Sequence, residues 1–313
     1  LFFTFLIYFV CNYLSGQKTE KYLNIHFKEC DQDTAIFYSL SWKTDSGYRE
    51  QVYYLYVKSL YSEGLYADIE LKNNNGDYKS FYGNKKLGTI GNYKQDKKDG
   101  VWLTYHYNGM LADSTFYVLG KRIGTSVHYY PNGFLKDSFF FNDNGSGVEV
   151  NWYDNGAVMS AGLYTKNYLK HGKWIYYHKN GIKSCAEKYD NGKLIYRKNF
   201  TEDDIEMEDT TEIIKRATFP GGEKALSKYL YINLYFPNNY KVENASKLTL
   251  YLSITINDEG KVIDIYPIIS VGPNVDKIMI RAIKSFPIWK PAIYKNHPIQ
   301  SVYTLPIAFL SDN

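Results

Sequence analysis

The sequence predicts a mainly β protein, in which an N-terminal array of β-hairpin repeats precedes a small α+β domain. Of the 313 residues, 33 are tyrosine and 18% are aromatic, a composition that favours strands. Glycines recur every 23 to 25 residues between Gly76 and Gly172. From residue 218 onward the pattern changes to helical and alternating segments. Three cysteines and a mean hydropathy of −0.42 exclude a disulfide scaffold and a polytopic membrane protein.

The repeat is a hairpin of about two dozen residues. Each repeating glycine is expected to open a strand, which leads through a turn to a second strand that ends on an aromatic residue. The turn is Asn-Gly in four of five units, and Asn-Gly favours a type I′ turn with positive φ at both central residues. A single hairpin cannot bury its aromatic face, so we expect successive hairpins to stack. The repeating glycines are Gly76, Gly100, Gly124, Gly147 and Gly172.

These units resemble MORN-variant repeats, whose pattern reads G-x-W-x-x-Y-x-x-N-G. Gly100, Trp102 and Tyr105 with the following Asn108-Gly109 match it, as does the unit that opens at Gly172. The middle units depart from it, because Ser126 and Glu149 replace the tryptophan. The resemblance covers residues 76–198 and implies an architecture more than a chemistry.

The first residues form an uncharged apolar run, which is short for a membrane span and fits the apolar region of a signal peptide. We therefore interpret residues 1–16 as a signal peptide or signal anchor, with membrane association through residues 1–14. Residues 17–75 are expected to form a β-rich cap on the repeats. Residues 199–217 form an acidic linker, with seven carboxylates and no Lys or Arg between 201 and 212.

Residues 218–313 read as helix–strand–strand–helix–strand. Leucines four apart predict a helix over 223–234, and strict alternation predicts a strand over 248–256. A turn at 257–260 leads to a second strand over 261–269. A second helix follows Pro273, with Asn274 as its expected N-cap. The last strand is expected over residues 301–309.

This order resembles the C-terminal domain of TonB-family proteins. The residues that carry the resemblance include the Phe-Pro-Gly-Gly run before the first helix and the Trp-Lys-Pro-Ala run after the second. Leu248 departs from it, because the family often has Gly there. The family motif positions are Phe219, Pro220, Gly221, Gly222, Trp289 and Pro291. The resemblance implies that the domain binds an extended peptide of an outer-membrane TonB-dependent receptor or another envelope protein.

Strand addition to a sheet edge is the physical basis of such binding. The last strand is the expected edge, and Pro306 supports that placement because proline lacks the N–H that a central strand needs. If Pro306 faces outward, the peptide ladder is interrupted there. The expected peptide-binding residues are Ser301, Val302, Tyr303, Thr304, Leu305, Pro306, Ile307, Ala308 and Phe309. Trp289 is interpreted as a core residue.

No enzyme motif, cofactor site or metal site is predicted. No nucleophile elbow, phosphate loop or metalloprotease pattern occurs, and the histidines on the repeats have no recurring carboxylate partner. Cys30 and Cys185 fit either a disulfide or two free thiols. The dispersed lysines give no nucleic-acid site.

Two functions remain. The first is a non-enzymatic protein in the periplasm or cell envelope of a Gram-negative bacterium that binds a receptor peptide, with energy transduction if it is anchored in the inner membrane. The second is a hairpin scaffold that binds a protein or glycan partner, with the C-terminal domain as its anchor.

Overall fold

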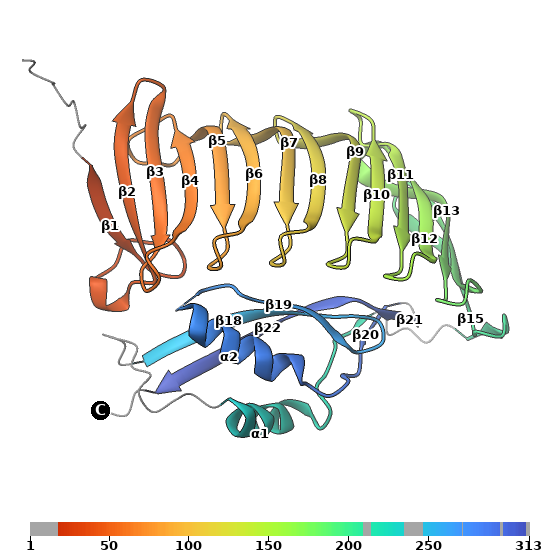
Figure 1. Ribbon diagram of the computed structural model, residues 1–313. Helices are drawn as coiled ribbons and strands as arrows, with labels where there is room; N and C mark the ends of the chain where they lie inside the picture. The colour runs from red at the N-terminus through yellow and green to blue at the C-terminus, as the bar shows by residue number, and fades with distance from the viewer. Residues whose placement is uncertain (1–17, 209–213, 235–246, 271, 295–296, 311–313) are drawn as a thin grey trace, which may run out of the picture.

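The computed structural model describes residues 18–208, 214–234, 247–270, 272–294 and 297–310. A long sheet of hairpins forms one part, and the C-terminal domain lies along one row of its hairpin turns (Figure 1). The apolar run and Cys11 at the start of the chain lie outside the described residues. Cys30 and Cys185 are both free thiols, so the disulfide alternative does not hold.

The hairpin array is a 16-stranded antiparallel sheet whose strands pair in the order of the sequence. The predicted cap contributes the first four strands to this same sheet, and the acidic segment contributes the last. The strands are β1 (Thr19–Leu23), β2 (Phe37–Thr44), β3 (Gly47–Tyr54), β4 (Leu60–Tyr66), β5 (Asn74–Phe81), β6 (Leu87–Lys94), β7 (Lys97–Tyr105), β8 (Leu111–Val118), β9 (Lys121–Tyr129), β10 (Leu135–Phe141), β11 (Gly147–Trp152), β12 (Val158–Thr165), β13 (Leu169–Tyr177), β14 (Lys183–Asp190), β15 (Lys193–Phe200) and β16 (Glu206–Met207). Two short 3₁₀ turns, Gln32–Thr34 and Lys166–Tyr168, interrupt the series.

The Asn-Gly turns differ from the prediction. In the turn between β7 and β8, the Gly109 N–H donates to the His106 carbonyl at 2.7 Å, and the His106 N–H donates to the Met110 carbonyl at 2.8 Å. Only Gly109 has a positive φ, of 89°, and Asn108 does not. This is a three-residue loop closed by a left-handed glycine, and not a two-residue type I′ turn. The prediction failed because Asn here uses its side chain: its Oδ1 accepts the Met110 N–H at 2.9 Å.

Two-residue turns with positive φ at both positions occur at the opposite end of the hairpins. Asn191 and Gly192 have φ of 47° and 85° between the paired residues Asp190 and Lys193. Leu119 and Gly120 form the equivalent turn between β8 and β9. The repeating glycines also sit differently from the prediction, because Gly100 lies inside β7 with φ of 76°.

The two faces of the array differ. The face that carries Trp102 and Trp174, here called the inner face, buries both indoles almost completely, at 2% and 1% exposure. It also buries small hydroxyl residues such as Ser126. The outer face carries exposed apolar side chains, among them Phe116 and Phe140. Because the faces alternate along each strand, the repeat phase of a residue decides which face it occupies.

The C-terminal domain follows the predicted order. Strand β18 (Lys247–Ile256) is the centre of a three-stranded sheet, with β19 (Val262–Pro267) and β22 (Ser301–Leu310) on its two sides. Helices α1 (Gly222–Asn233) and α2 (Pro273–Lys284) cover one face. A second small sheet that was not predicted consists of β17 (Ile214–Lys215), β20 (Ala292–Tyr294) and β21 (His297–Ile299). Gly272, and not Asn274, is the N-cap of α2, because Pro273 already occupies the first helical position.

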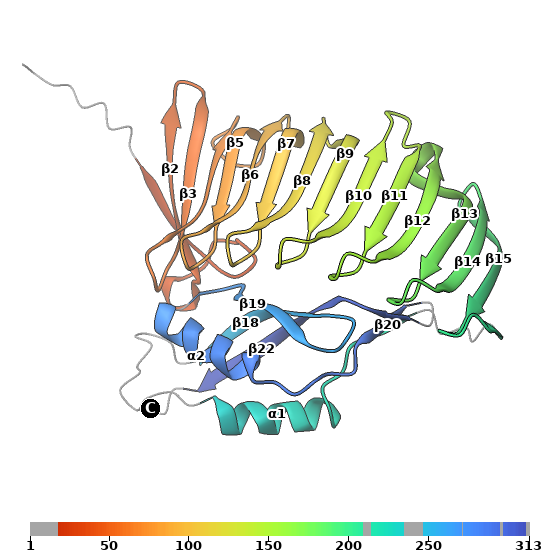
Figure 2. The same cartoon turned by 45° about the vertical axis from the view of Figure 1, so that its right-hand side comes forward.

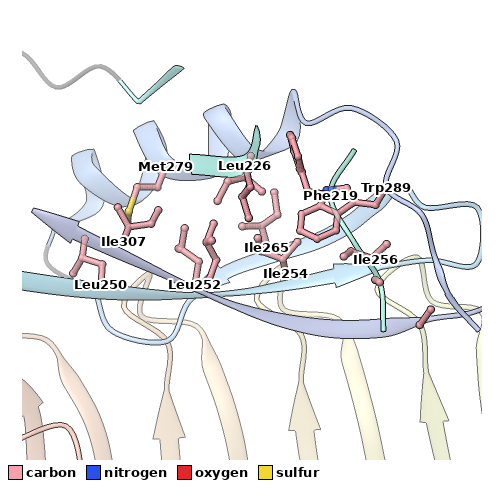
Figure 3. Close-up of a cluster of buried hydrophobic side chains, with 14 of the residues drawn as sticks. Phe219, Leu226, Leu250, Leu252, Ile254, Ile256, Ile265, Met279, Trp289 and Ile307 are labelled. Carbon is pink, nitrogen blue, oxygen red and sulfur yellow. The ribbon is translucent and has the colours of Figure 1, made fainter. Parts of the chain in front are cut away.

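The core of this domain lies between the helices and the sheet (Figure 3). Leu250, Leu252, Ile254 and Ile256 alternate along β18 and are all 0% exposed. They pack against a cluster that includes Met279 of α2. The alternation predicted from the sequence is therefore confirmed where the structure describes the side chains.

Candidate functional site

Strand β22 lies at the end of its sheet, as expected for a binding edge. The direction of its backbone groups follows from β18: the Ile268 N–H donates to the Tyr251 carbonyl at 2.8 Å, so Tyr251 faces β19. Neighbouring residues in a strand face opposite sides, so Leu252 faces β22 and pairs with Leu305. It follows that the backbone groups of Val302, Thr304 and Pro306 point away from the sheet.

The expected edge residues alternate between the core and the opposite face of the sheet. Leu305 and Ile307 are buried in the core at 3% and 8% exposure. Tyr303 is half-buried, and its hydroxyl donates to Glu223 of α1 at 3.1 Å. Val302, Thr304 and Pro306 are exposed and Ser301 is half-buried, whereas the side chains of Ala308 and Phe309 lie outside the described part. The free edge therefore offers the N–H groups of Val302 and Thr304. Pro306 has no N–H, so it interrupts the row of outward-facing donors.

The family motif residues are structural. Phe219 and Trp289 are buried at 7% and 2%, with ring centroids 5.4 Å apart in an edge-to-face arrangement. Gly221 is the N-cap of α1 with φ of 82°, and Gly222 follows with φ of 75°. Pro220 and Pro291 follow these aromatic residues by one and two positions, and both are half-buried. Sequence reasoning assigned Trp289 to the core, and this assignment is confirmed.

The second face of the C-terminal sheet faces the hairpin turns (Figures 1 and 2). Ser253 and Thr255, which point away from the helices, are still buried at 4% and 8%. On β19, the Tyr266 ring lies 5.3 Å from Tyr82 and 6.2 Å from Tyr107, which belong to two successive turns of the array. Burial raises the pKa of Tyr107 to about 12. On this second face of the C-terminal sheet, the described side chains of β22 remain exposed at the edge.

A lysine ties the array to the domain. Lys179 Nζ lies 2.9 Å from Asp154 of the neighbouring turn, 3.1 Å from Asp258 and 3.4 Å from Glu259. Burial raises the pKa of Asp258. Burial alone lowers the pKa of Lys179, but its hydrogen bonds to Asp154 and Asp258 outweigh this effect and raise it. Both pKa shifts are those expected of a partly desolvated cluster, in which the ammonium group of Lys179 stabilises the carboxylates close to one another.

A second charged cluster lies on the inner face of the array. His128 of β9 bonds through both ring nitrogens, with Asp113 of β8 and Asp137 of β10. Burial lowers the pKa of His128, but the hydrogen bonds to the two carboxylates outweigh this effect and raise it to about 9. The described residues contain no group of three metal ligands suited to a metal ion. Through its two bonds, the His128 imidazolium bridges β8, β9 and β10.

Two other array histidines, His106 and His178, form a ladder with tyrosines. The His106 ring bonds to the Tyr129 carbonyl at 2.8 Å and the His178 ring to the Phe200 carbonyl at 2.9 Å. Tyr153 makes the same bond one repeat earlier, to the Tyr177 carbonyl at 2.8 Å. These residues share one repeat phase, two places before each Asn-Gly. Sequence reasoning did not single out this phase, although alignment of the repeats on Asn-Gly places His106 and His178 at the same position.

A scan against protein-family models finds no matching family, and a search of curated proteins finds no match. Among the described residues, no helix combines the length and apolar character needed to cross a membrane. The described part of the chain therefore consists of an antiparallel hairpin array of 16 strands and a small α+β domain.

Proposed function

We propose that the C-terminal domain binds an extended peptide by strand addition to β22. The observation that carries the proposal is the outward direction of the backbone groups of Val302 and Thr304 on an edge strand. A strand added there gains main-chain hydrogen bonds that do not depend on peptide sequence. The buried alternate residues, Leu305 and Ile307, hold the edge in place from the core side.

The resemblance to TonB-family domains supports a receptor peptide as the ligand. The order of α1, β18, β19, α2 and β22 is the order that the resemblance implies. Under this proposal the protein works in the cell envelope of a Gram-negative bacterium, and its partner is an outer-membrane receptor. Energy transduction is part of the proposal only if the chain is anchored in the inner membrane.

The test is a titration of the labelled full-length protein with synthetic peptides from the periplasmic N-terminal segments of outer-membrane receptors. Amide shifts should change at Val302 and Thr304 and at their β18 partners. Thr304→Pro removes an outward N–H and should weaken binding at least tenfold, whereas Thr304→Ala keeps that N–H and should bind normally. Equal binding by the two variants would contradict strand addition at β22.

A stability control separates lost binding from lost fold. The outward position of Thr304 means that Thr304→Pro leaves the β18–β22 ladder intact and should cost about 1 kcal/mol or less. Leu305→Pro removes an N–H that faces β18 and should cost roughly 3 kcal/mol or more. A chemical-denaturation series compares the two. A reversed order of stability would refute the assigned strand direction.

The array supports a second proposal, a scaffold that binds a glycan directly while the C-terminal domain serves as its anchor. The observation that favours it is a row of cations and aromatic rings on the inner face.

A further inference from the structure

One repeat phase on the inner face carries a cation. Lys98 of β7 and Arg122 of β9 are 24 residues apart, and each lies two places before a repeating glycine. Lys98 Nζ lies 4.4 Å from the centre of the Trp102 ring and 5.3 Å from that of Tyr117. The Arg122 guanidinium lies 5.7 Å from the centre of each of the Phe139 and Phe141 rings. The cations therefore alternate with aromatic rings along the array.

Within the part of the chain that the structure describes, these two cations have no ion-pair partner. Among the described residues, neither Lys98 nor Arg122 has a carboxylate oxygen within 4.0 Å. Asp113, whose charge acts on Lys98, is engaged with His128. Glu149, which lies near the same tyrosine as Arg122, accepts the hydrogen bond of the Tyr164 hydroxyl. Burial lowers the pKa of Lys98, so its charge is held at a cost that an anion would relieve. Both side chains remain half-exposed, and an incoming group can reach them.

The spacing of the cations favours a polymer over a single anion. Lys98 and Arg122 lie two strands apart, a separation of roughly 10 Å at the usual strand spacing. A linear polysaccharide with one acidic group per disaccharide repeats over a similar length. Phosphates along a nucleic-acid strand follow one another more closely, at about 3.4 Å per strand in a duplex. Tyr93 and Tyr117 lie half-exposed on the same face, and aromatic rings of this kind contact the apolar side of sugar rings.

The far end of the inner face is closed by the C-terminal domain. Tyr294 of β20 packs there against the cluster of Trp174, Tyr176 and Cys185. Lys170, at the same repeat phase as Lys98, lies in this region with its Nζ 3.8 Å from the centre of the Trp174 ring. The segment from β6 to β10 is therefore the part that a polymer can reach.

We infer that the inner face of the array, between β6 and β10, binds a linear acidic polysaccharide, with Lys98 and Arg122 holding successive acidic groups. This inference rests on the scaffold role proposed for the array and is independent of strand addition at β22. His128 offsets one of the two charges of Asp113 and Asp137. Together with Lys98 and Arg122, it gives three cations against these two carboxylates. Affinity should fall with salt, as for any surface charge interaction.

The test is calorimetry or affinity electrophoresis of the full-length protein with hyaluronan oligosaccharides, which carry one carboxylate per disaccharide. Lys98→Gln with Arg122→Gln should weaken binding at least tenfold. The matched control is Lys173→Gln with Lys188→Gln, which removes the same charge from a cross-strand pair outside this row and should change affinity less than twofold. Neutral dextran should not bind.

Three outcomes would overturn the inference. Equal loss in both double variants would mean diffuse charge attraction only. Tighter binding of oligo(dT) than of hyaluronan would identify a nucleic-acid surface instead. Absence of binding to hyaluronan by the folded wild-type protein at low salt would remove the site. Thr304→Pro should bind hyaluronan normally, and the Lys98/Arg122 double variant should bind receptor peptides normally, so failure of one proposal is distinguishable from failure of the other.

Discussion

Trp174 lies over Gly162 on the neighbouring strand, so closely that a β-carbon on that glycine would overlap the indole ring. The indole N–H donates to the Leu163 carbonyl at 3.0 Å. Trp102 repeats the arrangement over Gly91. In the unit where serine replaces the tryptophan, Ser126 instead faces Thr115. Trp102 and Trp174 therefore pack over residues that have no side chain, so the two residues of each such pair are complementary in size.

We predict strong coupling between Gly162 and Trp174. Gly162→Thr should destabilise the protein by about 1–3 kcal/mol through overpacking. Trp174→Ser should cost about 3–5 kcal/mol through the cavity it leaves. The double variant recreates the Thr115/Ser126 pair. It should be more stable, by at least about 1 kcal/mol, than the sum of the two single losses predicts. Urea denaturation measures all three.

A second glycine provides the control for this cycle. A β-carbon on Gly64 would lie 3.3 Å from the edge of the Tyr66 ring, a contact that a small movement relieves. Gly64→Ala should therefore cost less than Gly162→Ala. Strict additivity in the Gly162/Trp174 cycle would contradict volume complementarity.

Lys179 should control the junction between the array and the C-terminal domain. Lys179→Met leaves Asp154 and Asp258 close together without a cation, so we expect a loss of about 1–3 kcal/mol at neutral pH. Hydrogen exchange should quicken at the turn formed by Asn257–Gly260 and remain unchanged in β2 and β3. Lys173→Met, on an exposed position of β13, is the matched control. Unchanged exchange at the turn would show that Lys179 does not hold the junction.

His128 should make stability depend on pH. Its pKa in the folded protein is raised from 6.5 to about 9, so its stabilising effect is fully present below pH 6.5. The effect is lost as the pH rises toward 9, and amounts to roughly 2–3 kcal/mol. This window lies below the pH at which tyrosines of the unfolded chain ionise. Unfolding free energy measured between pH 6 and 9 should fall in the wild type and vary less in His128→Asn. Parallel curves would contradict the charged bridge.

Replacing asparagine by glycine should have different effects on stability in the two kinds of turn. Asn108 donates through Nδ2 to the Pro131 carbonyl at 2.8 Å and accepts the Met110 N–H, so Asn108→Gly should cost about 1–2 kcal/mol. Asn191 has a positive φ, which glycine adopts without strain, so Asn191→Gly should be nearly neutral. Thermal unfolding of the two variants measures the difference. A larger loss for Asn191→Gly would contradict the turn assignment.

The sequence by itself determined the period of the array and the alternation of the C-terminal strands. Both follow from local rules, since Gly100 and Gly124 mark a repeat and the alternating leucines of β18 mark a buried face. It also placed β22 at a sheet edge through Pro306. It failed on the turn type, because Asn-Gly fits two kinds of loop. The structure adopts the one in which the Asn108 side chain accepts the Met110 N–H and also donates to the next repeat.

Only the tertiary structure decided what meets across the chain. Lys179 and Asp258 are 79 residues apart, and no local pattern predicts their contact. The same holds for Tyr266 between Tyr82 and Tyr107, and for the burial of Ser253 and Thr255 under the hairpin turns. Periodicity shows which face of a strand a side chain occupies. Which residues that face contacts depends on how the surfaces of the array and the C-terminal domain fit together. The residues that determine this fit are spread over the whole chain.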